Sequence, residues 1–215
     1  MIDPVTLAVL KGRLEQIADE MDATLFRSAF NPIIAEAHDA SHGLYEAETG
    51  DTLVQGKSGL PIFVGVMAFA ARAVIAKSKR DGDLADGDVY LFNDPYDGGT
   101  HVSDFKLIRP YFRDGKLFCW LASVGHWHDV GGNVPGNYNP VATEVFQEAT
   151  LIPPVKVARA GRLQQDIVDI LRANTRLPLS VYGDLNGQLN ALDLGVRRMD
   201  DLQTLDALDR AGVEI

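Results

Sequence analysis

Apolar residues recur at three- and four-residue spacing over two long stretches, which predicts two amphipathic helices. The first covers residues 4–28, where Asp3 can cap the helix and Pro4 suits its first turn. The second covers about residues 179–211, and Gly212 is a natural stop. The apolar stripes are Leu7, Leu10, Leu14, Ile17, Met21 and Leu25 in the first, and Leu185, Leu189, Leu192, Val196, Met199, Leu202 and Leu205 in the second. We expect both to face the core, with a seam between subunits as the alternative for the first.

Two further segments have helical patterns of different kinds. Residues 63–78 are apolar nearly all round and rich in alanine, which predicts a buried helix. Residues 164–176 carry a narrower apolar stripe, made of Ile167, Ile170 and Leu171. The chain is therefore expected to contain four helices.

Short apolar runs bounded by turn residues lie between these helices and predict strands. Helices and hairpins alternate without a regular βαβ order, so we expect an α+β fold, with long amphipathic helices packed on a mainly antiparallel sheet of hairpins. We expect residues 1–215 to form a single domain. The predicted strand segments are residues 33–55 (a hairpin), 89–93, 106–112, 116–124 and 155–157.

Composition and charge narrow the class of protein. The 215 residues are 46% hydrophobic and 23% charged, which is enough to bury a sizeable core. The net charge of −10 argues against a nucleic-acid partner. The single cysteine, Cys119, excludes a disulfide within the chain. No signal peptide and no apolar run of about 20 residues is visible, so we expect a cytoplasmic protein that does not enter a membrane.

The candidate chemistry is concentrated in residues 93–132, which hold three of the five histidines. His101 and Asp104 are three residues apart, so a tight loop can aim both at one point. His126 follows the next strand, and His128 faces the same way if that strand continues. Two imidazoles and one carboxylate with open positions suit a catalytic zinc, manganese or iron(II) ion. We therefore expect His101, Asp104 and His126 to be metal ligands.

The residue pattern alone also allows a plainer alternative, in which these histidines are loop residues bonded to the backbone. Other acids in the stretch, Asp94, Asp97 and Asp129, can orient the imidazoles. The group His38, Asp39 and His42 is expected to be solvated and is not favoured as a set of ligands.

Candidate nucleophilic and acid–base groups lie in and just after the same stretch. Ser103 and Ser123 lie near histidines, but neither sits in a G-x-S-x-G turn. No P-loop and no G-x-G-x-x-G motif occurs, so this chain shows no nucleotide site of its own. Glu144 and Glu148 come at helical spacing, and Glu148 is favoured as an acid or base because it precedes the apolar residues 149–152. The alternative is a solvated helical turn.

Several separate motifs resemble those of the hydantoinase B/oxoprolinase family. They are GDVYLFNDPYDGGTHVSDF, GHWHDVGG, PGNYNPVATEVFQEATLIPPVKV and LRANTRLPLSVYGDLNGQLNAL, in that order. By position, the resemblance implies that His101, Asp104 and His126 are metal ligands. His128 and Asp129 match the family's neighbouring polar pair. With Glu148, they are our candidate catalytic residues.

The resemblance also implies a function shared between two proteins. A hydantoinase A-type partner binds ATP and phosphorylates a small-molecule substrate, and the B-type chain hydrolyses the activated cyclic amide at its metal. Such a chain is expected in a hetero-oligomer. Two alternatives stay open: a subunit of an ATP-dependent ketone carboxylase of the acetone or acetophenone type, and a non-catalytic assembly subunit.

Three departures from the family pattern bear on substrate and completeness. Phe63 stands where relatives often carry histidine, and Ala149 stands where glycine is usual. Family B chains are also considerably longer, so this chain is expected to match the N-terminal part of a longer architecture. We expect the remaining part of that architecture to be a separate polypeptide, a part missing from this sequence, or absent.

Overall fold

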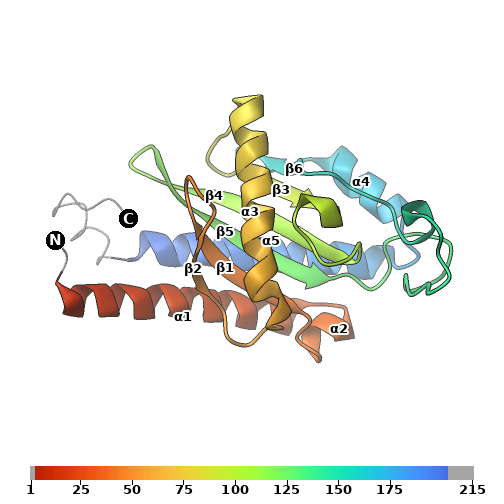
Figure 1. Cartoon of the computed structure of the whole chain (residues 1–215), viewed down its shortest axis with the longest axis horizontal. Helices are drawn as coiled ribbons and strands as arrows, with labels where there is room; N and C mark the ends of the chain where they lie inside the picture. The colour runs from red at the N-terminus through yellow and green to blue at the C-terminus, as the bar shows by residue number, and fades with distance from the viewer. Residues whose placement is uncertain (1–2, 203–215) are drawn as a thin grey trace.

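The computed structural model describes residues 3–202, which form an antiparallel sheet between helices (Figure 1). The sheet has seven strands in the order β2-β1-β5-β4-β3-β6-β7, and each neighbouring pair is antiparallel. The predicted α+β class is confirmed. The strands are β1 (Ala40–Glu46), β2 (Thr52–Gln55), β3 (Val89–Phe92), β4 (Asp104–Arg113), β5 (Lys116–His126), β6 (Val155–Arg159) and β7 (Arg162–Leu163).

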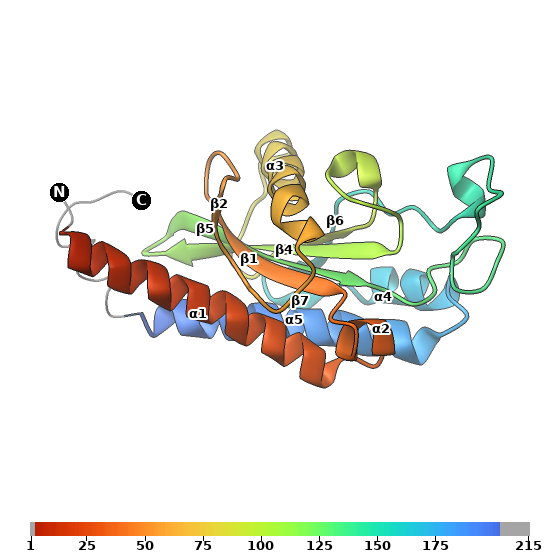
Figure 2. The ribbon, with the colours of Figure 1, turned by 60° about the horizontal axis from the view of Figure 1, so that its bottom comes forward.

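Helices cover both faces of the sheet (Figure 2). The two longest, α1 (Pro4–Ser28) and α5 (Pro178–Asp200), lie side by side on one face, and α3 (Ile62–Asp81) lies on the other. Two shorter helices, α2 (Pro32–Ala35) and α4 (Gln165–Ala173), and the 3-10 turns η1 (Pro95–Asp97) and η2 (Val145–Gln147) complete the elements. No described helix combines the length and the apolarity that a bilayer crossing requires.

The long helices form where the apolar periodicity predicts them. Asp3 caps α1 by accepting the N–H groups of Val5 and Thr6 at 3.0 Å, as expected. The predicted stripe of α1 is buried from Leu10 onward, whereas Leu7 is exposed. In α5 the buried members of the stripe are Leu185, Leu192 and Met199; Leu202, also buried, lies just after the helix, and Leu205 lies outside the described residues.

Helix α3 corrects one expectation. Phe63, Met67 and Val74 are buried against the sheet, but Ile62 and Phe69 are exposed. The prediction of a helix buried all round is wrong, because no other described helix covers the outer side of α3. An apolar composition records how hydrophobic a helix is, and it does not record how many of its sides have a neighbour.

Several element boundaries differ from the expectations. Asn31 caps the short helix α2, so residues 33–55 begin with a helical turn before their two strands. The helix expected over residues 164–176 is shorter. Helix α5 ends at Asp200, short of the expected end near residue 211, and residues 203–211 of that prediction lie outside the described part.

The sheet separates two apolar layers. Strand side chains alternate, so Phe105 and Leu107 of β4 join the layer under α1 and α5, and Ile108 joins the layer under α3. Asp104 and Lys106 share the α3 face with Ile108 by the same alternation. The polar end of the β4–β5 hairpin therefore opens on the side of the sheet that carries α3.

Candidate metal centre

The three predicted ligands meet at the end of the β4–β5 hairpin that lies opposite its turn. Asp104, the first residue of β4, pairs with His126, the last residue of β5, and His101 lies in the loop just before β4. Their candidate ligand atoms all lie within 4.8 Å of one another. His101 Nε2 is 3.6 Å from Asp104 Oδ2, and His126 Nδ1 is 3.4 Å from Asp104 Oδ1. The structure thus brings the predicted set together.

The donor atoms fit a divalent cation. Asp104 Oδ1 and His126 Nδ1 are buried, and neither has a hydrogen-bond partner in the described chain. Buried polar atoms normally have hydrogen-bond partners. Two adjacent buried atoms that have none, and that are both good metal ligands, therefore favour a bound ion at this position. The Thr100 hydroxyl donates to the other oxygen of Asp104, which orients that carboxylate. The His101 side chain is 53% exposed, so the cluster is open on one side.

Asp39 is a fourth candidate ligand, although the sequence pattern did not favour it as one. Its Oδ2 lies 3.8 Å from His126 Nδ1, and its carbonyl accepts the His126 N–H at 3.0 Å. Burial raises the pKa of Asp39, and the nearby His126 opposes that rise. Asp39 reaches the cluster because β1 pairs with β5, an arrangement between segments more than 80 residues apart.

The expectation of a solvated group at residues 38–42 is wrong for His42. His42 is buried, with Nδ1 2.8 Å from Asp22 Oδ1 and Nε2 2.9 Å from Ser123 Oγ. These three residues have the order of a nucleophilic triad, but all are fully buried on the α1 side of the sheet. Substrate cannot reach Ser123 there, so the arrangement holds elements together. His38 is exposed, as expected, and stacks on Phe26.

Lys106 adds a positive charge close to the cluster. Its side chain is buried, and its Nζ lies 5.4 Å from the centre of the Phe92 ring. Burial lowers the pKa of Lys106 to about 8, although the carboxylates of Asp104, Asp94 and Asp97 oppose this change. Nζ has no hydrogen-bond partner among the described residues.

The glycine pair before the cluster, Gly98 and Gly99, lets the loop pack closely. Gly98 has φ +86°, and a Cβ there would overlap the backbone of Ala70 in α3. Asp94 caps the turn η1 by accepting the Tyr96 N–H at 2.9 Å. No described bond joins Asp94 or Asp97 to an imidazole, so their proposed orienting role has no support from these contacts.

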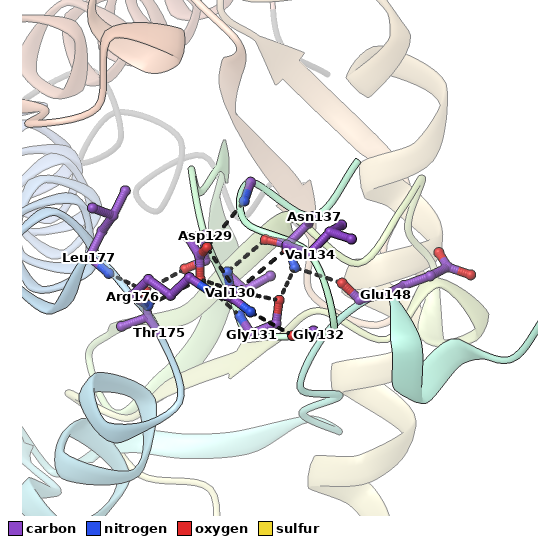
Figure 3. Close-up of polar contacts among 11 residues, drawn as sticks. Asp129, Val130, Gly131, Gly132, Val134, Asn137, Glu148, Thr175, Arg176 and Leu177 are labelled. Carbon is purple, nitrogen blue, oxygen red and sulfur yellow. Dashed lines mark hydrogen bonds and ion pairs between the residues drawn. The ribbon is translucent and has the colours of Figure 1, made fainter. Parts of the chain in front are cut away.

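Asp129 organises the loop after β5 (Figure 3). Its buried carboxylate accepts the N–H groups of Gly131, Gly136 and Arg176, and it pairs with the Arg176 guanidinium at 3.1 Å. Burial acts to raise the pKa of Asp129, but these donors outweigh it and the pKa is lowered. No described contact joins Asp129 to an imidazole of the cluster. Its role as a catalytic acid or base stays a prediction.

No described contact joins the other candidate catalytic residues, His128 and Glu148, to the three ligands. The strand β5 ends at His126, so the condition for His128 to face the same way is not met. His128 lies close enough to Asp184 to oppose the rise in that residue's pKa, which burial brings to about 6. The backbone carbonyl of Glu148 accepts from Asn137, while its side chain points away from the Asp129 loop (Figure 3). Their roles stay predictions.

Comparisons with known proteins agree with these motifs. The family model for hydantoinase B/oxoprolinase matches residues 3–211. The chain is 36% identical to caprolactamase subunit beta of Pseudomonas jessenii over 213 residues, which are 99% of this chain and 35% of that protein. It therefore spans about a third of the length of this relative.

Two solved structures are similar to this one. The crystal structure of ATP-dependent caprolactamase from Pseudomonas jessenii matches 99% of this chain and 35% of its own, with a TM-score of 0.82 and 35% identity. Nucleotide-free acetone carboxylase matches 93% of this chain and 26% of its own, with a TM-score of 0.87 and 24% identity, which is a likeness of fold. The matched family model and the caprolactamase likeness place this chain in the hydantoinase B/oxoprolinase family.

Proposed function

We propose that this chain carries the metal centre of an ATP-dependent enzyme that opens cyclic amides of the hydantoin or 5-oxoproline type. The observation that supports this most is the convergence of His101, Asp104 and His126, with two buried donor atoms that have no hydrogen-bond partner among the described residues. The caprolactamase relative adds to it, because caprolactam is itself a cyclic amide.

The residues of the chain have distinct parts in this proposal. His101, Asp104 and His126 would hold manganese, zinc or iron, and Asp39 is placed to join them. Such an ion lowers the pKa of a bound water and polarises a carbonyl or phosphoryl oxygen. Thr100 fixes the Asp104 carboxylate by donating to it. The exposed side of His101 leaves room for a substrate to approach.

ATP would enter through a partner. No phosphate-binding glycine motif occurs in this chain. In the proposal, a hydantoinase A-type subunit binds ATP and phosphorylates the amide oxygen, and the intermediate is hydrolysed at the metal. The hetero-oligomer and the small-molecule substrate remain part of the proposal.

A ketone carboxylase subunit is the second candidate, supported by the fold likeness to acetone carboxylase. The ion that the same cluster would hold would then act as a Lewis acid toward a substrate oxygen. An assay of ATP turnover with hydantoins, 5-oxoproline and caprolactam, and separately with ketones plus bicarbonate, distinguishes the two. Turnover that depends on bicarbonate would overturn the hydrolase.

Elemental analysis tests the metal centre itself. Protein purified without chelator should contain close to one equivalent of a divalent metal, and His101→Ala, Asp104→Ala and His126→Ala should each lose most of it. His38→Ala is the matched control, because this exposed histidine lies outside the cluster and should leave metal content unchanged. Metal retained by all three cluster variants would refute the ligand assignment. Substoichiometric metal in the wild type, unchanged in His101→Ala, would favour a non-catalytic assembly subunit.

A further inference from the structure

Lys106 is buried in an unusual way. It follows Asp104 by two residues on β4, so both side chains leave the same face of the sheet. The lysine is 1% exposed, and its Nζ has no hydrogen-bond partner in the described chain. An unpaired buried ammonium is costly, so its presence beside a candidate metal centre calls for a physical reason.

The second buried lysine shows what an ordinary structural role looks like here. Lys156 Nζ lies 2.7 Å from Asp83 Oδ1 and 2.8 Å from Asp88 Oδ2, and it also donates to the Asp83 carbonyl. Lys106 has no such pair, although Asp104 lies on the same strand face. Among the described residues, Lys106 therefore has the Phe92 ring as a neighbour but no carboxylate in hydrogen-bond contact.

The backbone makes specific room for this charge. A Cβ at Gly99 would overlap Lys106 Nζ, so the absence of a side chain at Gly99 lets the ammonium occupy this position, and a larger residue would displace the end of the lysine. Gly99 belongs to the loop that carries His101, and the packed ring of Phe92 lies on another side of Nζ. The ammonium is thus held between the metal-binding loop and the sheet, shielded from water.

We propose that Lys106 is a specificity-determining residue, whose fixed positive charge makes the metal centre favour anionic ligands over neutral ones. The inference rests on the metal centre proposed above. A positive charge behind the ligands repels a cation and attracts an anionic oxygen, and burial strengthens both effects. Lys106 acts through its field and needs no contact with the bound molecule. The favoured class is a substrate that carries a phosphoryl or carboxylate group.

Opposite changes in two affinities test the field. In Lys106→Met the side chain keeps its length and loses its charge. We expect the variant to bind Mn²⁺ more tightly, and its Mn²⁺-loaded form to bind inorganic phosphate more weakly, each on the order of tenfold at pH 7. Electron paramagnetic resonance of free Mn²⁺ and ³¹P relaxation give the two dissociation constants. Acetate, followed by ¹³C relaxation, replaces phosphate in a second series.

Controls separate the field from other causes. Lys116→Met removes the same charge at the other end of the hairpin, where Lys116 pairs with Arg113, and should change neither constant. A damaged fold would weaken both affinities, and this outcome would overturn the proposal, as would no change in either. If Lys106→Met binds Mn²⁺ more tightly and phosphate but not acetate more weakly, the favoured ligand carries a phosphoryl group. If the variant binds both phosphate and acetate more weakly, the favoured class also includes carboxylates. Wild-type protein that binds no Mn²⁺ would refute the metal centre itself.

Discussion

The carboxylate of Asp129 has two possible roles that predict different measurements. As a loop organiser it satisfies three backbone N–H groups and Arg176, whereas as a proton carrier it would act on a substrate. We expect Asp129→Ala to lower the free energy of unfolding by about 1–3 kcal/mol, because buried donors lose their acceptor. Urea unfolding measures this loss. An Asp129→Ala protein as stable as the wild type, but inactive, would instead support the catalytic role.

The same residue gives a pH dependence of defined sign. The folded pKa of Asp129 is lowered, so its contribution is present above the unfolded value of about 3.9 and is lost as pH falls through the folded pKa. We therefore expect the free energy of unfolding to fall on acidification below about pH 4. Asp129→Asn should flatten this fall. An unchanged slope in the variant would contradict the assignment.

At this scale the sequence identified the residues whose partners are near in the chain or across one hairpin. His101, Asp104 and His126 could be grouped because a loop spacing and a single β-turn bring them together. Asp39 could not, since its approach to His126 depends on the pairing of β1 with β5. Asp129 was predicted as a polar site residue, but its Arg176 partner lies 47 positions away and gives no local signal.

The loop between β3 and β4 depends on its fit against α3. Gly98 has a positive φ and touches the α3 backbone. Gly98→Ala should therefore strain the loop in two ways, through an unfavourable backbone conformation and through a steric overlap with α3. We expect a loss of about 1–3 kcal/mol in the free energy of unfolding and weaker metal binding. Gly65→Ala in α3 is the matched control, because a Cβ there has nothing within 4 Å and should stabilise the helix by about 0.5–1 kcal/mol. Equal effects of the two substitutions would contradict this account.

A buried chain of hydrogen bonds connects helices on one face to the strands. Asp22 of α1 contacts His42 of β1, His42 contacts Ser123 of β5, and Gln188 of α5 donates to Ser123 at 3.2 Å. Removing one member leaves its neighbour buried without a partner, so Asp22→Ala and His42→Ala should each destabilise the fold by roughly 2–4 kcal/mol. A double-mutant cycle should give a coupling energy of about 1–3 kcal/mol. Additive losses would show that the contact between Asp22 and His42 has no coupling energy and does not contribute to stability.

The local sequence pattern predicted where helices and strands occur along the chain, but it did not predict what packs against each of them. The periodicity of α1 and α5 and the turn residues of the β4–β5 hairpin are local, so α1, the start of α5 and the hairpin turn were placed to within a residue or two. The side of α3 that stays exposed is set by what packs beyond it, which periodicity cannot record. The order of the strands, with β1 beside β5, is likewise a long-range outcome.

At the scale of the whole molecule, the main feature is that the chain is much shorter than its relative. It covers 35% of caprolactamase subunit beta, yet it contains all the cluster residues described above. Metal binding and complete activity are therefore separable questions. We expect the chain by itself to bind the ion, and turnover to require further polypeptide.

Co-elution with a hydantoinase A-type subunit tests this separation. Size-exclusion chromatography of the mixture should show one complex, with ATP turnover that depends on a cyclic amide. Asp104→Ala should still co-elute, because its buried side chain belongs to the metal cluster, but its complex should have lost turnover together with its metal. Separate peaks at micromolar concentrations would contradict an obligate partnership. A variant complex as active as the wild type would show that assembly, and not metal chemistry, is what this chain contributes.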